Sequence, residues 1–154
     1  MSAKLLYAAF VPVLPVIVLL AAPSECATSD SPRVQALRHQ NAGFELARQG
    51  LLAEAIAEYN RGIAVDPNVG SLYYNRGRAY TELSDYQSAL ADLNKAIELE
   101  ADAPQYYYQR AVVFHAVGSS DQARSDIEAV LSMTSDPDVV YPAQTLLARI
   151  IGGD

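Results

Sequence analysis

The sequence has one cysteine, no tryptophan and few of the side chains that hold a metal ion. Cys26 stands alone, and the two histidines, His39 and His115, are 76 positions apart. A single thiol cannot form an internal disulfide or a cysteine zinc cluster, and neither histidine has a partner at metal-ligand spacing. We therefore expect no metal, no cofactor and a fold stabilised by packing alone.

Positive charge is also scarce. The chain has 11 Lys and Arg against 18 Asp and Glu, a formal net charge of -7. Nucleic acid requires basic side chains to neutralise its phosphates, and anionic lipid attracts basic segments, so this balance argues against both as partners. A glycine-rich phosphate loop and a Gly-x-Ser-x-Gly turn are absent from the sequence as well. These absences predict that the protein has no catalytic residues and is not an enzyme.

What the chain does have, at its start, is a long apolar run. Lys4 is the only charge before residue 25, and residues 5–22 carry no charged side chain. A short basic start, an apolar run and then small and polar residues are the layout of a secretory signal peptide. Residues 1–26 are thus predicted to export the chain to the periplasm or out of the cell.

The same run leaves a second interpretation open. The apolar residues 5–22 are just enough to span a bilayer as a helix, which would make residues 1–26 an uncleaved signal anchor. Pro12 and Pro15 weaken a long straight helix and argue against this interpretation. Contact with a membrane is expected through this segment only.

The remainder of the chain repeats itself every 34 residues. Seven sets of three residues, most of them similar in size or character, fall into register at this spacing, which is the signal of a repeat architecture. The sets are Gly43, Gly77 and Ala111; Leu46, Tyr80 and Phe114; Gly50, Ser84 and Gly118; Ala55, Ala89 and Ala123; Tyr59, Leu93 and Ile127; Gly62, Ala96 and Val130; and Ile63, Ile97 and Leu131.

Each repeat contains two stretches with apolar residues at helical spacing. In the middle repeat these are Leu72–Leu83, with Leu83 on the buried face, and Tyr86–Leu99. A helix pair with one apolar face cannot bury it alone, so neighbouring pairs must stack. The sequence therefore predicts an all-α fold, an α-solenoid of three helix-turn-helix repeats. The acidic residues of the second helices are expected on the solvated outer face: Glu54, Glu58, Asp92, Glu98, Asp126 and Glu128.

This pattern resembles the tetratricopeptide repeat (TPR). The middle repeat carries the family signature most fully, at Tyr73, Gly77, Tyr80, Ala89, Leu93 and Ala96. The resemblance divides the chain into a linker over 27–35, repeats over 36–69, 70–103 and 104–137, and a C-terminal helix over 138–151 that caps the last repeat. In that helix Pro137 or Pro142 is expected only within the first turn.

In this family the first helices of successive repeats line a concave groove that holds a peptide or a partner's helix. We expect Tyr74 and Tyr108 to be exposed there as interface anchors, and Tyr73 and Tyr107 to pack between repeats. Carried over by position, the resemblance implies a groove lined by Gln40, Asn41, Phe44, Arg48, Tyr74, Asn75, Arg78, Glu82, Tyr108, Gln109, Val112 and His115.

One branch of the family is disfavoured by the residues at its binding positions. Co-chaperones with these repeats grip a chain-terminal carboxylate with a clamp of Lys, Asn, Asn, Lys and Arg. The matching positions here are Gln40, Phe44, Asn75, Gln105 and Gln109, of which Asn75 alone agrees. Without the cations a terminal carboxylate has no charge-assisted partner.

The resemblance thus predicts an exported adaptor that binds a protein or peptide in its groove. The alternative is a structural component of a cell-envelope assembly, tethered to the membrane by residues 5–22. In both cases the partner is a protein, and the stacked helices provide the surface or the spacer through which the protein acts.

Overall fold

A computed structural model describes residues 30–152, and this part of the chain folds into seven α-helices without a β-strand. The predicted signal segment, 1–26, lies outside the described residues. Among the described helices none is both long and apolar enough to cross a bilayer. The helices are α1 (Pro32–Arg48), α2 (Leu52–Val65), α3 (Gly70–Glu82), α4 (Tyr86–Leu99), α5 (Pro104–Ala116), α6 (Ser120–Met133) and α7 (Pro137–Gly152).

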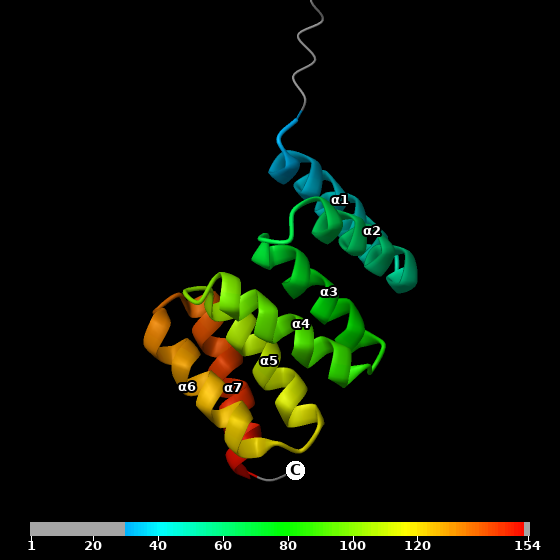
Figure 1. Cartoon of the computed structure of the whole chain (residues 1–154). Coiled ribbons are helices and arrows are strands. Elements are labelled where there is room, and N and C mark those ends of the chain that lie inside the picture. The colour runs from blue at the N-terminus through cyan, green and yellow to red at the C-terminus, as the bar shows by residue number, and fades with distance from the viewer. Residues whose placement is uncertain (1–29, 153–154) are drawn as a thin grey trace, which may run out of the picture.

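The helices form three antiparallel pairs that stack in chain order, with α7 closing the stack (Figure 1). Contacts are densest within the pairs α1–α2, α3–α4 and α5–α6. The second helix of each pair also packs on the first helix of the next, and α7 packs on both α6 and α5. The predicted α-solenoid of three repeats with a terminal helix is therefore confirmed.

Small residues let the two helices of a pair approach closely, as the repeat pattern predicts. A Cβ atom built on Gly43 in α1 would lie 2.5 Å from the Tyr59 ring of α2. One built on Gly77 in α3 would lie 3.1 Å from Leu93 of α4. On the second helices, Ala89 is fully buried. An added Cβ atom would therefore clash at Gly43 and fit only tightly at Gly77.

The turn inside each pair requires a left-handed backbone at one position. Gly50 and Gly118 have φ of 78°, and Ser84, at the equivalent position of the middle repeat, has φ of 60°. In each turn the last amides return to carbonyls of the preceding helix, for example Ser84 N to Thr81 O at 2.9 Å. Leu83, predicted on the buried face, is instead 50% exposed because it caps α3 just before this turn.

The structure differs from two predictions at the ends of the domain. The first helix begins at Pro32, inside the linker expected over 27–35, because Ser31 accepts a hydrogen bond from Val34 N and proline suits the first helical position. The last helix runs through Pro142, which was expected only in a first turn. It continues because one stripe of the helix beyond this point is buried, at Ala143, Leu146 and Ile150.

Two of the acids predicted on a solvated outer face are buried. Asp92 and Asp126 are each 6% exposed. Arg76 donates to both oxygens of Asp92, at 2.7 and 2.6 Å, and Arg110 donates to both oxygens of Asp126, at 2.8 and 2.7 Å. The prediction was wrong here because a forked guanidinium on the first helix pairs with each carboxylate and so permits its burial.

The same two arginines connect successive repeats. Arg76 also donates to Asn60 of the first repeat, and Arg110 to Asn94 of the second. In the first repeat Ala42 stands where the others have arginine, and Glu58 takes a hydrogen bond from His39 Nδ1 at 2.7 Å instead. The second and third repeats thus share the same arginine–aspartate pair between their first and second helices. The first repeat has a histidine–glutamate contact between its two helices instead.

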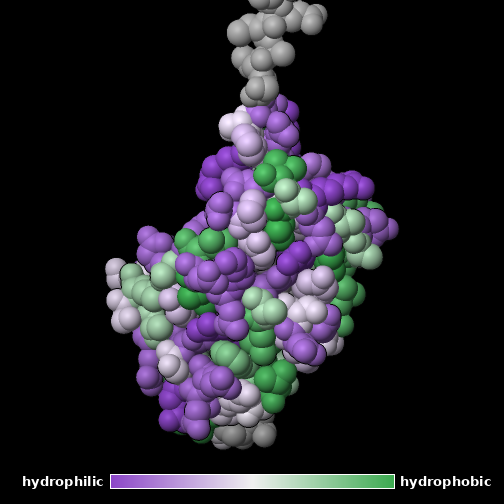
Figure 2. All heavy atoms as spheres, in the orientation of Figure 1, coloured by the Kyte–Doolittle hydropathy of each residue, from purple (hydrophilic) through white to green (hydrophobic). Residues whose placement is uncertain are grey.

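Apolar side chains are mostly hidden between the helices. On the face that Figure 2 shows, hydrophilic side chains cover most of the surface, and apolar ones are scattered among them without forming one broad patch. On this face, a binding surface therefore has to be sought in a local hollow rather than in an extensive apolar patch.

Candidate functional site

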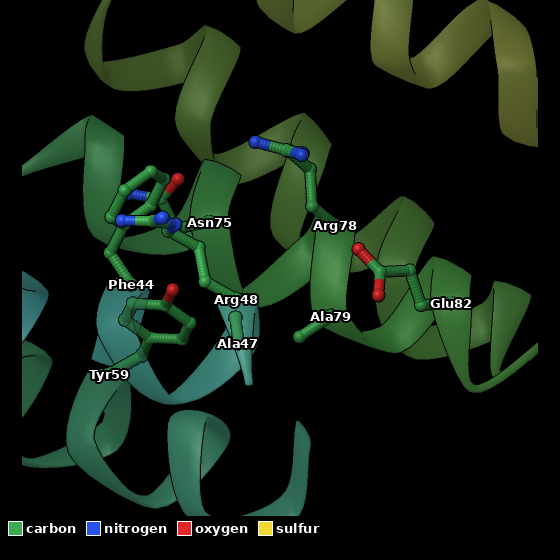
Figure 3. Close-up of a pocket in the computed structure, with 8 residues that line it drawn as sticks. All are labelled: Phe44, Ala47, Arg48, Tyr59, Asn75, Arg78, Ala79 and Glu82. Carbon is green, nitrogen blue, oxygen red and sulfur yellow. The ribbon is translucent and has the colours of Figure 1, made fainter. Parts of the chain in front are cut away.

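The clearest hollow in the groove lies between the first helices of repeats 1 and 2. It has a volume of about 120 Å³ and brings α1 and α3 side chains together over one residue of α2 (Figure 3). Five of the twelve predicted groove residues line it. The full lining is Phe44, Ala47, Arg48, Tyr59, Asn75, Arg78, Ala79 and Glu82.

Part of the lining is apolar and rigid. Ala47 and Ala79 are small residues that leave space between α1 and α3, and Phe44 beside them is 44% exposed. Tyr59 is 1% exposed and is wedged against Gly43. Burial raises the pKa of Tyr59, so its hydroxyl stays protonated and can donate a hydrogen bond.

Three of these lining residues were missing from the predicted groove. Ala47 and Ala79 follow predicted residues by one helical turn on the same face, so the 3.6-residue period could have found them. Tyr59 is on a second helix and reaches the hollow only because Gly43 has no side chain. No periodic signal within one helix predicts such a residue.

The rest of the lining carries charge and hydrogen-bonding groups. Arg48 lies 3.4 Å from the carboxylate of Glu45, one turn earlier on the exposed side of α1. Arg78 has no carboxylate within 4.0 Å among residues 30–152, and its guanidinium lies 5.8 Å from the centre of the Tyr74 ring. In Figure 3, Phe44 and Arg48 stand on one side of the hollow and Arg78 and Glu82 on the other.

Two of the predicted amide residues of the groove connect neighbouring first helices. Ser71 Oγ donates to Gln40 Oε1 at 2.5 Å, which joins α3 to α1. Gln109 Nε2 lies 3.5 Å from Thr81 Oγ1 and joins α5 to α3 more weakly. Asn41 is exposed on α1. Gln40 and Gln109 therefore link the first helices of neighbouring repeats.

Tyr74 is not an exposed anchor, contrary to the prediction. Its ring stacks on Tyr106 of the third repeat, with centroids 4.8 Å apart and planes inclined by 31°. Burial raises the pKa of Tyr74. The Tyr106 hydroxyl in turn donates to Glu100, which also accepts from Gly70 N at 3.1 Å. Tyr74 is half-buried against α5, so this side chain joins repeats 2 and 3.

The end of the groove formed by the third repeat is partly covered by α7. Tyr108 and Val112 pack against the core that α7 completes, and Tyr108 lines a second hollow of about 150 Å³ with Gln105, Asp138, Val139 and Pro142. His115 is half-buried near the end of α5. The predicted groove residues of this repeat therefore form a separate part of the surface, apart from the hollow between α1 and α3.

Tyr73 and Tyr107 occupy equivalent positions at the loops between repeats. Their hydroxyls donate to Pro67 O at 3.2 Å and Ala101 O at 3.1 Å. Their rings pack on the core, and the guanidinium of an arginine three residues later lies 5.6 Å from each ring centre. This is the packing between repeats that was predicted for them.

Within residues 30–152 no three His, Cys, Asp or Glu side chains are grouped so that they could hold a metal ion. The groups that the hollow presents are guanidinium, amide, phenol and carboxylate. Such a set binds ligands through hydrogen bonds, charge and apolar contact.

Comparison with known proteins agrees with the repeat pattern. A family model described as TPR repeat matches residues 43–83 and 77–118. A search of curated proteins finds no match.

Solved structures similar to this chain include two TPR domains named RPAP3, each with a bound peptide. The first TPR of Spaghetti (RPAP3), bound to the HSP90 peptide SRMEEVD, is 28% identical with a TM-score of 0.74, covering 78% of this chain and 93% of that one. The second TPR domain of human RPAP3, in complex with the HSP70 peptide SGPTIEEVD, is 29% identical with a TM-score of 0.72, covering 78% and 98%.

A more distant structure shows the same fold. The TPR2B domain of yeast Sti1 is 22% identical with a TM-score of 0.75 and covers 79% of this chain and 99% of that one. With three stacked helix pairs, the signature residues in place and these matches, the chain belongs to the tetratricopeptide-repeat family.

Proposed function

We propose that this protein is an adaptor that binds a peptide or a helix of a partner protein in the groove lined by α1, α3 and α5. The observation that carries the proposal is the hollow between α1 and α3, where an exposed Phe44 and an alanine-lined floor lie beside two arginines. Aromatic side chains and arginine are the residues that most often anchor interfaces. The similar TPR domains with bound peptides support it.

The partner we propose is not the tail of a chaperone. Of the five positions that would form the carboxylate clamp, only Asn75 carries the clamp's residue. The side-chain oxygen of Gln40 already accepts a hydrogen bond from the Ser71 hydroxyl. At the next clamp position Phe44 has an aromatic ring where the clamp has an amide. A terminal carboxylate would thus lose its cationic partners, and the peptides seen with similar domains are not expected to bind well.

The proposal is tested by removing the exposed ring from the hollow. Phe44→Ala should abolish or strongly reduce capture of partners from an envelope extract, because a central aromatic anchor is worth roughly 2 kcal/mol or more. The matched control is Leu83→Ala, which removes a side chain that is 50% exposed at a turn, outside the hollow. Equal capture by both variants and the parent would contradict binding in this hollow.

We further propose that the adaptor is exported, since residues 1–26 have the layout of a signal peptide and TPR domains are as a rule interaction modules without catalysis. The alternative is a structural part of an envelope assembly held by residues 5–22. N-terminal sequencing of the protein from cells separates the two. A start between residues 25 and 29 supports export and cleavage, whereas an intact Met1 supports the tethered form.

A further inference from the structure

We propose that the hollow between α1 and α3 selects a segment in which an Asp or Glu side chain stands within about two residues of an apolar or aromatic side chain. This inference rests on the proposed function and names the chemistry of its partner. The segment is recognised by its side chains and does not require a free chain terminus.

The apolar requirement follows from the floor of the hollow. Ala47 and Ala79 are too small to fill the space between α1 and α3 beside Phe44, and the buried Tyr59 completes the apolar part of the lining. A volume of about 120 Å³ suits one side chain and not a folded surface. Moving an apolar side chain from water onto this floor removes apolar area on both partners, which favours binding.

The acidic requirement follows from the arginines on both sides of the hollow. Arg48 comes from α1 and Arg78 from α3, so their guanidinium groups border it from two helices. Arg78 has no carboxylate partner among the described residues, and Arg48 reaches only Glu45, at 3.4 Å. Guanidinium groups of this kind bind a carboxylate through paired hydrogen bonds.

The charge of the groove differs in sign from that of the chain. Of the twelve predicted groove residues, Glu82 is the one acid, against Arg48 and Arg78, whereas the whole chain has a formal net charge of -7. Acidic side chains elsewhere repel an anionic segment, so the hollow is where such a segment is best accommodated. Tyr74 supports this role, since its ring is fixed on Tyr106 and lies beside the Arg78 guanidinium.

Binding in this hollow does not require a peptide with a free carboxyl terminus, because the arginines do not stand at the positions that would clamp a terminal carboxylate. The positions on α1 and α5 that would hold the terminal carboxylate carry amides, at Gln40, Gln105 and Gln109. The two arginines instead line the hollow from the C-terminal parts of α1 and α3. One side-chain carboxylate held there would leave the main chain free to continue along the groove.

The first experiment is a peptide selection on the full chain, purified in a mild detergent. A library of random 12-residue peptides is fused through its C-terminus to a phage coat protein, so that no peptide carries a free carboxyl terminus. We expect the captured peptides to be enriched in Asp or Glu within two positions of Phe, Tyr, Leu or Ile. Captured peptides without this pairing, or enriched in Lys and Arg, would overturn the inference while leaving peptide binding intact.

A selection in which the parent captures no more peptides than the Phe44→Ala variant would count against the proposed function itself, and the inference would fall with it. The two failures are therefore distinguishable. Captured peptides of the wrong chemistry reject only the inference, whereas the absence of Phe44-dependent capture rejects both.

The second experiment measures the affinity of the most enriched peptide, synthesised with an amide at its C-terminus and a fluorescent label. Arg48→Gln with Arg78→Gln should weaken binding at least about tenfold, because a charge-assisted hydrogen bond pair is lost. Exchanging the peptide's acid for its amide should weaken binding to the parent by a similar factor and have little further effect on the double variant.

The matched control is Arg124→Gln with Arg149→Gln, which removes the same charge from exposed positions on α6 and α7. The control should bind the peptide like the parent. Equal weakening by both double variants would show a general charge effect and overturn the assignment of the carboxylate to the hollow.

Discussion

At the scale of single residues, the site depends on a contact that no individual helix contains. Tyr59 of α2 reaches the floor of the hollow past Gly43 of α1, where a Cβ atom would lie 2.5 Å from the ring. The ring is 1% exposed and cannot swing out to make room. Gly43 therefore supports both the packing of the first repeat and the shape of the candidate site.

Gly43→Ala should lower the free energy of unfolding by roughly 1–3 kcal/mol, because it overpacks the contact with the Tyr59 ring. It should also weaken capture of the partner, since the ring lines the hollow. Urea denaturation followed by circular dichroism measures the first effect. Glycine to alanine in an open helix would instead stabilise by about 0.5–1 kcal/mol, so an increase in stability would contradict the packing described here.

The contact of His39 with Glu58 makes the stability of the first repeat depend on pH. The hydrogen bond from His39 holds the pKa of Glu58 below its ordinary value, and Arg61 adds to this against the opposing effect of burial. Because the folded pKa is the lower one, the carboxylate stabilises the fold above its unfolded pKa. This contribution is lost as the pH falls through the folded pKa.

Glu58→Gln should therefore be less stable than the parent at pH 7, by roughly 0.5–1.5 kcal/mol for a hydrogen bond of this kind. The difference should close as the pH is lowered below about 4. Urea midpoints between pH 7 and pH 3 test this. Glu98→Gln, which removes an exposed partner of Lys95, serves as the control and should show a smaller difference throughout. A deficit of Glu58→Gln that stays constant down to pH 3 would reject the assignment.

At the scale of elements, the turns decide how each helix pair closes. All three turns place the residue after the cap in the left-handed region, with glycine in the first and third repeats and Ser84 in the second. A Cβ atom on Gly50 or Gly118 would meet nothing within 4 Å, so only the backbone conformation disfavours a side chain there. The middle turn, where the family signature is otherwise fullest, is the strained one.

Ser84→Gly should raise the free energy of unfolding by about 0.5–1 kcal/mol, because glycine has no Cβ atom to clash with the backbone at a positive φ. Gly118→Ala should lower it by a similar amount for the same reason. Thermal unfolding of both variants beside the parent tests the pair. Shifts of the same sign in the two variants would mean that the turns are not equivalent in backbone conformation.

At the scale of the whole molecule, each repeat is stabilised by contact with its neighbours, and α7 packs on the last repeat. The last helix buries Ala143, Leu146 and Ile150 against the third repeat, where Ile127 and Val130 are fully buried. Without it this face would be open to water, as expected for the end of a stack of repeats. The helix also lies beside Tyr108 and covers part of the groove there. It therefore reduces the length of groove that is open to a ligand as well as closing the core.

Ending the chain after residue 136 should therefore lower the urea midpoint of the whole helical transition and expose apolar surface that binds a hydrophobic dye. The control is Ile151→Ser in the full chain, which changes a residue of α7 that is 65% exposed. The control should unfold like the parent. A truncated protein that unfolds at the parent midpoint would show that α7 does not contribute to the stack.

The sequence by itself determined the architecture of this protein. The 34-residue spacing of small and large apolar residues predicted three stacked helix pairs, because a single pair cannot bury its apolar face alone. The resemblance to the tetratricopeptide repeat added the terminal helix and, carried over by position, the groove residues Phe44, Arg48, Asn75, Arg78 and Glu82, all of which the structure places around one hollow. Periodicity was therefore sufficient for the helix pairs, whereas the groove residues came from their position in the family pattern.

Only the tertiary structure decided which polar and aromatic residues are buried. Tyr74 was expected to be exposed in the groove, but its ring stacks on Tyr106 of the next repeat and is half-buried. Asp92 was expected in water, but Arg76 pairs with it in the interior. Tyr59 reached the site from a second helix because of a glycine on the first. Each outcome depends on a partner that the neighbouring helix or repeat brings into contact after folding, and the pattern of a single helix carries no signal for it.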